Sequence, residues 1–272
     1  MIDVEAYLAR IGYEGSLEPS IKTLSALHEA HLNTVPFEDI DVYLGRAINL
    51  SEDALFEKIV RRKRGGFCYE LNGLFGALLR RLGFDVTLLD AQVSRPGATF
   101  GPAFDHIALL VALDRPWLAD VGFPRSPVTP LPLDASGRYE VSGVSFRITF
   151  DDDTGTLSRL RRGGWEPQYR FNFVPRQIED FRDMCRFHAT SPESPFYRWL
   201  GCTIFTADGR TTLSDDTLTV RRGNTRTETP VRPADVPATL RTHFGITLDA
   251  SDHAELLAQP RYRGRFVSSV RS

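Results

Sequence analysis

The hydrophobic period of the chain changes at Gly83, and this change limits the folds that the sequence can adopt. From Tyr69 to Leu82 apolar residues recur at steps of three and four, as on the buried face of an α-helix, and Gly83 is a natural stop. Beyond Gly83, short runs rich in Val, Ile, Leu and aromatic residues are separated by Pro, Gly and Asp. These runs cover residues 86–93, 107–113, 117–121, 144–150 and 169–173. The pattern predicts a helical first part followed by an antiparallel sheet or barrel.

Two helix starts can be placed upstream of this change. Ser20 is a good N-cap for a helix over residues 21–33. Ser51 is followed by Glu52 and Asp53, which puts acidic side chains at the positive end of another helix. The first part of the chain is therefore expected to be largely helical.

The end of the chain predicts a smaller mixed unit. The expected elements are a helix over about 177–189, a linker or ordered surface loop over 191–195, a hairpin of strands 203–206 and 210–213, a neighbouring strand at 218–220 and a helix over 234–244. We therefore expect an α+β fold of three units. They are a helical domain over 1–83, an antiparallel sheet or barrel with a closing helix over 84–190, and a smaller mixed unit over 191–272.

The charge balance argues against several classes of partner. The chain of 272 residues carries 33 Lys plus Arg against 35 Asp plus Glu, so no overall basic field attracts nucleic acid or an anionic membrane. No run of about 18 apolar residues is present, and the N-terminus lacks a basic segment followed by an apolar stretch. Basic residues at 61–64 and 221–222 could contact phosphates, although solvated surface charge is the simpler interpretation.

The cysteines point to a reducing compartment and to one candidate nucleophile. Cys68, Cys185 and Cys202 are too few and too scattered for a disulfide framework or a CxxC metal site, so a cytoplasmic location is expected. Cys185 and Cys202 have neither a glycine-rich approach nor a clear basic neighbour, and we interpret them as small hydrophobic residues.

Cys68 differs because it follows two glycines and begins the strongest predicted helix. The free N–H groups and the positive dipole end of a helix stabilise a thiolate, so a lowered pKa is expected for Cys68, particularly beside a cationic His. The same N–H groups could hold the oxygen of a tetrahedral intermediate. Cys68 also shares a helix face with Leu71 and Phe75, as a merely structural buried cysteine would.

His106 and Asp120 are the candidate partners of this cysteine. His106 lies at the start of one apolar run and Asp120 near the end of the next, and the two segments are close enough in sequence to pair. A carboxylate in an apolar strand needs a partner, which His106 would supply. Asp120 would then hold one imidazole nitrogen while the other faces Cys68, as in a triad of nucleophile, base and orienting acid.

The remaining histidines are weaker candidates. His28 and His31 fit polar positions of a helix, His188 ends a helix whose dipole suits its charge, and His243 and His253 fall in the third unit. Cys, His and Asp can also ligate a metal. No fourth ligand occurs at a sensible spacing, so no metal is expected.

Residues 64–72, Arg-Gly-Gly-Phe-Cys-Tyr-Glu-Leu-Asn, resemble the nucleophile signature of the arylamine N-acetyltransferases. Val-Pro-Phe-Glu at 35–38 resembles the upstream element of that family. Asp-Val-Gly-Phe at 120–123 and residues 175–196 follow in the family's order, and the resemblance is weakest after about 205.

The resemblance implies a helical first domain that bears the nucleophile, an antiparallel β-barrel second domain and an α/β lid, with a cysteine-protease-like triad core between the first two domains. It also implies a ping-pong reaction. Cys68 would take an acetyl group from acetyl-CoA, a co-substrate rather than a permanently bound cofactor, and pass it to an arylamine, arylhydrazine or N-hydroxyarylamine. It further implies that Arg64 and Glu38 support the nucleophile and that Phe37 and Phe123 contact substrate. A core role for Phe37 and a homodimer remain open.

Two residues depart from the family pattern. Pro124 stands where a glycine is common, and Asp105 stands where a small hydroxylated residue precedes the histidine. Proline removes a backbone donor, and Asp105 adds charge beside the base. These departures concern donor contacts and acyl-chain preference more than the chemistry.

Three rival functions remain. A thiol hydrolase or transglutaminase-like enzyme could order Cys, His and Asp in the same way, although the Cys-Gly-Ser-Cys-Trp pattern of papain-type proteases is missing. An amide synthase of a biosynthetic pathway would use the same triad on another acyl chain. A non-catalytic binding module would keep Cys68 as a packed thiol.

Overall fold

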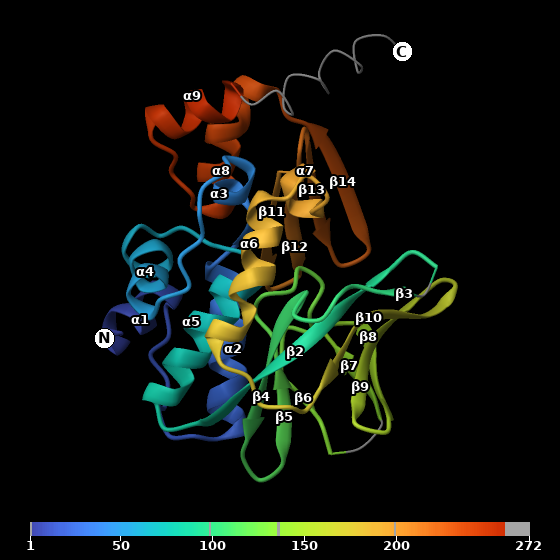
Figure 1. Cartoon of the computed structure of the whole chain (residues 1–272). Coiled ribbons are helices and arrows are strands. Elements are labelled where there is room, and N and C mark those ends of the chain that lie inside the picture. Colours follow the sequence, from blue (N-terminus) through green and yellow to red (C-terminus); the bar gives the residue numbers. More distant parts are fainter. Residues whose placement is uncertain (1, 98, 135–136, 199, 259–272) are drawn as a thin grey trace.

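The computed structural model describes residues 2–97, 99–134, 137–198 and 200–258, and its architecture is α+β (Figure 1). Helices of the first part lie beside a large antiparallel sheet, and a smaller sheet with two helices lies above them in the view of Figure 1. The predicted fold class is therefore confirmed.

The helical part begins at the caps that the sequence predicts. Ser20 Oγ accepts a hydrogen bond from the backbone N–H of Thr23 at 3.1 Å, and Ser51 Oγ accepts one from Ala54 at 3.4 Å. The helix after Ser51 changes after five residues into a π-helical turn, Glu57–Arg61. The elements of this part are α1 Val4–Ile11, α2 Ile21–Thr34, α3 Ile40–Tyr43, α4 Glu52–Phe56 and α5 Cys68–Arg81.

The large sheet is antiparallel throughout and curls towards a barrel. Its strand order is β6-β5-β4-β2-β10-β9-β8-β7, and β3 pairs with β2. The strands are β2 Asp85–Arg95, β3 Thr99–Phe100, β4 His106–Ala112, β5 Pro116–Ala119, β6 Leu131–Pro132, β7 Gly137–Val141, β8 Val144–Asp151, β9 Thr154–Arg161 and β10 Gly164–Asn172. All five predicted runs are strands, and β7 and β9 are strands that the sequence analysis missed.

The lid has a second antiparallel sheet and two helices. Its elements are β11 Gly201–Thr206, β12 Gly209–Ser214, β13 Thr217–Arg222, β14 Thr225–Pro230, α8 Val236–Phe244 and α9 Ala250–Ala258, with a 3-10 turn at Pro233–Asp235. The predicted hairpin is confirmed, since β11 pairs with β12 and Thr206 lies opposite Gly209. The sequence analysis missed β14 and α9.

The lid sheet also takes a strand from the helical part. Strand β1, Phe37–Glu38, pairs with β11 so that Phe37 lies opposite Thr203. A 3-10 turn, Ile178–Phe181, and helix α6, Arg182–Thr190, then connect the barrel to the lid, with the short α7, Pro195–Arg198, after them. The division of the chain at residues 83 and 190 stays a prediction.

Helix α5 lies against the barrel sheet and places its first turn at the junction of the parts. It packs on β4 and β2, and a Cβ on Gly76 would lie only 3.4 Å from Leu109 and 3.5 Å from Leu88. Three clusters of buried apolar side chains form the core, one around α5, one inside the barrel and one in the lid. In the described part of the chain, no helix is long and apolar enough to cross a membrane.

Candidate active site

The two glycines before Cys68 fix the approach of the chain to α5. Glu38 N–H donates to Gly66 O at 2.9 Å, which places the segment of Phe37 beside the cysteine. A Cβ on Gly65 would lie 1.9 Å from Pro36 O, so only glycine fits there. Cys68 is the first residue of α5, and its side chain is buried. The sequence pattern thus brings a thiol to a helix N-terminus inside the protein.

His106 and Asp120 meet at the ends of neighbouring strands. His106 begins β4 and Asp120 directly follows β5, and the predicted pairing of these segments is confirmed by the register of Leu109 with Ala119. His106 Nε2 donates to Asp120 Oδ2 at 2.9 Å, and both side chains are buried. This bond leaves His106 Nδ1 as the nitrogen that can take a proton.

Asn72 holds the carboxylate of Asp120, a role that the sequence analysis did not assign. Its side-chain N–H groups donate to Asp120 Oδ1 at 2.8 Å and to Ile107 O at 2.7 Å, and its oxygen accepts from Val121 N–H at 2.9 Å. Gly122 N–H also donates to Asp120 Oδ1 at 2.9 Å. Asn72 lies one helical turn after the cysteine, and this spacing was the available signal.

His28 supports the same carboxylate segment from behind. Its Nε2 accepts a hydrogen bond from Asp120 N–H at 3.1 Å, and its Nδ1 donates to Val128 O at 2.9 Å. The side chain is buried, and burial lowers the pKa of the imidazole. The predicted polar position of His28 on a helix therefore lies in the core rather than on the surface.

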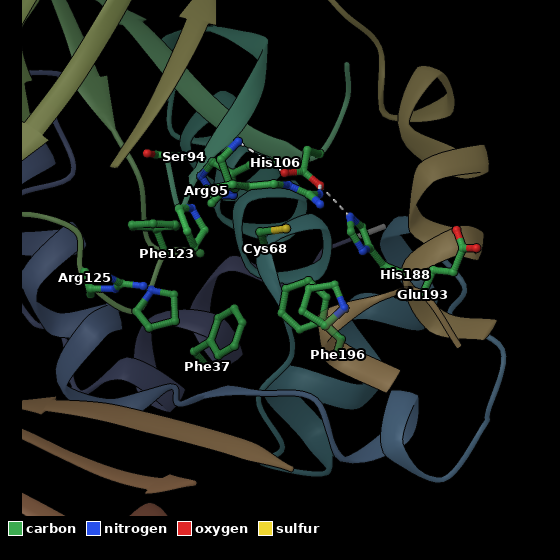
Figure 2. A pocket seen from close by; sticks show the side chains of 16 residues that line it. Phe37, Cys68, Ser94, Arg95, His106, Phe123, Arg125, His188, Glu193 and Phe196 are labelled. Atoms are coloured by element: carbon green, nitrogen blue, oxygen red, sulfur yellow. Dashed lines mark hydrogen bonds and ion pairs between the residues drawn. The ribbon is translucent and has the colours of Figure 1, made fainter. Parts of the chain in front are cut away.

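A cavity of about 530 Å³ brings the candidate residues together (Figure 2). Cys68 lies near the middle, with His106 beside it and aromatic side chains around them. Among the described residues, no hydrogen bond joins the thiol directly to the imidazole. The lining comprises Phe37, Cys68, Val93, Ser94, Arg95, Pro96, Asp105, His106, Gly122, Phe123, Pro124, Arg125, His188, Glu193, Pro195 and Phe196.

Comparisons with known proteins show the family of the chain. Residues 20–253 match the N-acetyltransferase family model. The arylamine N-acetyltransferase of Mycolicibacterium smegmatis is 38% identical over 228 residues, which cover 81% of this chain and 83% of that protein. The chain belongs to the arylamine N-acetyltransferase family. It is an acyltransferase.

Solved structures of this family share the fold. The arylamine N-acetyltransferase of Nocardia farcinica superposes with a TM-score of 0.89 at 33% identity, covering 96% of this chain and 95% of that one. The Mycobacterium marinum arylamine N-acetyltransferase in complex with CoA gives a TM-score of 0.86 at 31% identity, covering 97% and 98%. The resemblance noted in the sequence is confirmed.

A buried ion-pair network lies behind the first turn of α5 in this N-acetyltransferase. Arg64 Nε donates to Glu38 Oε1 at 2.9 Å and Arg64 Nη2 to Asp41 Oδ1 at 3.2 Å. Lys58 Nζ lies 2.8 Å from Asp41 Oδ2 and 2.7 Å from Glu70 Oε1. Burial alone would raise the pKa of Asp41, but the two cations outweigh it and hold the pKa at about 2. The network therefore stays charged and fixes the chain around the cysteine.

The electrostatics of the thiol differ from the sequence prediction. Burial raises the pKa of Cys68, and the negative charges of Asp120 and Asp105 raise it further, whereas a hydrogen bond to the backbone of Ile107 works in the other direction. The predicted lowering of this pKa is therefore wrong for the thiol taken alone, because the helix start lies in the interior beside two carboxylates. Ionisation of Cys68 requires that its proton move to His106, which keeps the net charge of the site unchanged.

Asp120 is suited to stabilise that transfer. Burial would raise the pKa of Asp120, but His106 and the hydrogen bonds from Asn72 and Gly122 outweigh it and lower the pKa. The acid therefore remains a carboxylate and can stabilise the imidazolium that forms.

Both departures from the family pattern have partners elsewhere in the chain. Asp105 Oδ1 accepts a hydrogen bond from His188 Nε2 at 3.0 Å. Pro124 O accepts one from Arg210 Nη1 at 2.8 Å, which links the lid to the segment after Asp120. The sequence analysis placed His188 at a helix end for its dipole, but its ring is buried in the wall of the cavity.

Arginines gather on the lid side of the cavity. Burial lowers the pKa of Arg210 to about 10, and the charges of four neighbouring arginines add to the lowering. Arg125 lines both the catalytic cavity and a second cavity of about 450 Å³ between barrel and lid. The cluster comprises Arg125, Arg159, Arg161, Arg210 and Arg221. It concentrates positive charge beside the cavity that contains Cys68.

Proposed function

We propose that this enzyme is an acetyl-CoA-dependent N-acetyltransferase that acetylates arylamines, arylhydrazines and N-hydroxyarylamines through an acetyl group on Cys68. The observation that carries the proposal is the shared cavity of Cys68 and His106, with the far nitrogen of His106 held by Asp120 at 2.9 Å. The family membership supports the donor and the acceptor class.

In the first half-reaction, His106 Nδ1 takes the proton of Cys68 and the thiolate attacks the carbonyl carbon of acetyl-CoA. The tetrahedral intermediate places its oxygen near the N–H groups of Cys68 and Tyr69 at the start of α5, since those of Glu70 and Leu71 already donate to Phe67 O. The bond to the CoA sulfur then breaks, and the departing thiolate takes the proton from His106. The products are free CoA and acetyl-Cys68.

In the second half-reaction, the acceptor nitrogen attacks the acetyl-Cys68 carbonyl. His106 takes one proton from that nitrogen, the bond to Cys68 breaks, and the proton returns to the thiolate. The enzyme is regenerated and the acetylated amine leaves. Asp120 keeps the imidazole in the tautomer that both steps need. Phe37 supplies an apolar wall for the acceptor, and Phe123 contacts substrate on the side of Arg125.

The arginine cluster is the proposed site for the phosphates of CoA. Arg159 Nε is buried and has no hydrogen-bond partner within the described part of the chain, and Arg159, Arg210 and Arg221 line the cavity that adjoins the one of Cys68. Guanidinium groups bind phosphates in bidentate geometry. We expect Arg159→Ala to raise KM for acetyl-CoA several-fold but to leave KM for S-acetyl-N-acetylcysteamine, which lacks phosphates, unchanged. Equal effects on both donors would contradict this placement.

The experiment that tests the function is mass spectrometry of the intact protein after mixing with acetyl-CoA alone. One added acetyl group on Cys68 is expected, and 4-methoxyaniline should then remove it as the N-acetyl product. The Cys68→Ala variant is the matched control. If the wild-type thiol reacts rapidly with iodoacetamide but gains no acetyl group from acetyl-CoA, the amide synthase alternative is favoured instead.

A further inference from the structure

A second histidine–carboxylate pair, His188 and Asp105, lies in the wall of the same cavity, and Figure 2 shows His188 on the opposite side of Cys68 from Phe123. His188 Nε2 donates to Asp105 Oδ1 at 3.0 Å, and His188 Nδ1 lies 3.1 Å from Ser194 Oγ. The other oxygen of Asp105 accepts from Val93 N–H at 3.2 Å. The imidazole is only 1% exposed. This chain of bonds joins β2, the residue before β4, and the segment that follows α6.

The pair holds an aromatic wall of the cavity in place. Phe196 N–H donates to Ser194 Oγ at 3.2 Å, and the His188 ring packs edge-on against Phe196 with centroids 5.2 Å apart. Phe196 lines the cavity and lies 6.2 Å from the ring of Phe37 on its other side. The position of Phe196 therefore depends on His188 through both a hydrogen-bond chain and a ring contact.

The pair is not suited to exchange protons with a substrate. Both nitrogens of His188 have protein partners, whereas His106 Nδ1 has none among the described residues. An imidazole with both nitrogens engaged orients its neighbours rather than acting as a base. The contribution of Asp105 and His188 to the reaction must therefore be positional.

The location of the wall indicates which substrate it serves. In Figure 2, His188 and Phe196 lie on one side of Cys68, and Phe123 and Arg125 lie on the other. Arg125 belongs to the arginine cluster, so a donor with phosphates approaches from its side. The side of Phe196 therefore remains for the acceptor, whose aromatic ring would pack on Phe196.

We propose that Asp105 and His188 are positioning residues for aromatic acceptors: they hold Phe196 so that the acceptor ring packs with its nitrogen directed at acetyl-Cys68. The pair acts in the second half-reaction and is dispensable for loading of Cys68. The inference rests on the proposed function and adds a determinant of acceptor specificity to it.

The test measures the two half-reactions separately in the His188→Ala variant. Release of CoA on mixing with acetyl-CoA, without acceptor, should stay within about twofold of wild type. Removal of the acetyl group by 4-methoxyaniline should slow about tenfold or more, because a ring held loosely spends less time in the reactive orientation. Removal by hydrazine, which has no ring to place, should remain close to wild type.

Matched variants separate positioning from loss of folding. Arg186 lies on the same helix, points to solvent and forms an ion pair with Asp183 outside the cavity, so Arg186→Ala should change no step. Asp105→Asn can restore the link, since an amide N–H can donate to His188 Nε2 while Nδ1–H donates to Ser194; it should retain most of the 4-methoxyaniline rate. Ser194→Ala should give an intermediate loss.

The outcomes decide between clear alternatives. Equal slowing of hydrazine and 4-methoxyaniline in His188→Ala would overturn the inference, because the defect would then lie at the thioester and not at the ring. A His188→Ala variant with a wild-type 4-methoxyaniline rate would overturn it as well. If His188→Ala fails to fold, the same comparison of acceptors in Ser194→Ala decides. Failure of the wild-type enzyme to form acetyl-Cys68 would instead refute the proposed function.

Discussion

Two histidine–carboxylate pairs lie beside Cys68, and the consecutive residues Asp105 and His106 belong to different pairs. Asp105 bonds to His188 at 3.0 Å, whereas the next residue, His106, bonds to Asp120 at 2.9 Å. All four side chains are buried. The pairs differ in the second nitrogen of each ring. Nδ1 of His188 meets the hydroxyl of Ser194, but Nδ1 of His106 has no hydrogen-bond partner among the described residues.

This difference shows how two similar pairs can have different functions. A histidine–carboxylate bond fixes a tautomer in either case, but only a ring with one free nitrogen can accept and return a proton. The pair of His106 is therefore suited to chemistry, and the pair of His188 to holding a wall. Each of the following predictions can break or sharpen this contrast.

The largest effect is expected for the thiol that lies between the pairs. Cys68→Ala should abolish acetyl transfer, a loss of more than about 10⁴-fold, since Cys68 supplies the one thiol among the residues that line the cavity. The measurement is N-acetylation of 4-methoxyaniline with acetyl-CoA. Cys185→Ala, which removes a buried thiol outside the cavity, should retain near wild-type turnover. Substantial turnover without Cys68 would remove the basis of the comparison.

Replacing each acid by its isosteric amide should show directly that the two pairs have different functions. Asp120→Asn should reduce acetylation of Cys68 by about 10³- to 10⁴-fold, because the amide favours the wrong tautomer of His106. Asp105→Asn, one position before the base, should cost less than about tenfold at pH 7, since its pair performs no proton transfer. Rates of CoA release give both values. Similar losses for the two variants would show that the pairs are not functionally distinct.

The parts of this site that lie close together in sequence were predictable. Glycines before Cys68, the start of β4 at His106 and the end of β5 at Asp120 followed from local pattern, because each reflects a turn or a strand end. Five strands also followed from short apolar runs, but their bounds did not, since β10 begins at Gly164 and the predicted run at Tyr169. Strand β14 could not be predicted, since all six of its residues are exposed and only pairing with β13 makes it a strand.

The supporting residues could not be predicted, because folding brings them from afar. His28 lies 92 positions before Asp120, and His188 lies 83 positions after Asp105. A helix pattern indicates that a histidine lies on a helix but not which strand end its ring will meet. The predicted lowering of the Cys68 pKa was wrong for the same reason. The direction of the shift depends on burial and on Asp105 and Asp120 rather than on the helix start.

Removing the amide that ties α5 to the catalytic pair should have an intermediate effect. Asn72→Ala leaves Val121 N–H without its hydrogen-bond partner. It also removes the amide N–H groups that donate to Ile107 O and to Asp120 Oδ1. We expect the free energy of unfolding to fall by about 1–3 kcal/mol and acetylation to slow by roughly 10- to 100-fold. Urea unfolding and CoA release are the measurements. Loss of stability with wild-type kinetics would mean that Asn72 holds the fold but not Asp120.

The smallest effect concerns the charge of Asp105 on the thiol. Cys68 is faced by Asp120, Asp105, Cys185 and His106, and burial with the two carboxylates raises its pKa. A negative charge disfavours the thiolate, so Asp105→Asn should lower that pKa and move the pH midpoint of iodoacetamide labelling downward. Below the ordinary thiol pKa of about 8.5, the thiol is protonated in both the folded and the unfolded chain. Above it the unfolded chain loses its proton first, so the free energy of unfolding falls as pH rises.

The pH midpoint of labelling therefore distinguishes an effect of the charge of Asp105 from a purely structural role of this residue. If Asp105 acts only as a tie, His188→Ala and Asp105→Asn should leave the pH midpoint where it is in wild type. If its charge also acts on Cys68, the midpoint should fall in Asp105→Asn, where the carboxylate is gone, and not in His188→Ala, where it remains. A midpoint that rises in Asp105→Asn would contradict the expected direction, because removal of an anion cannot disfavour a neighbouring thiolate through its charge.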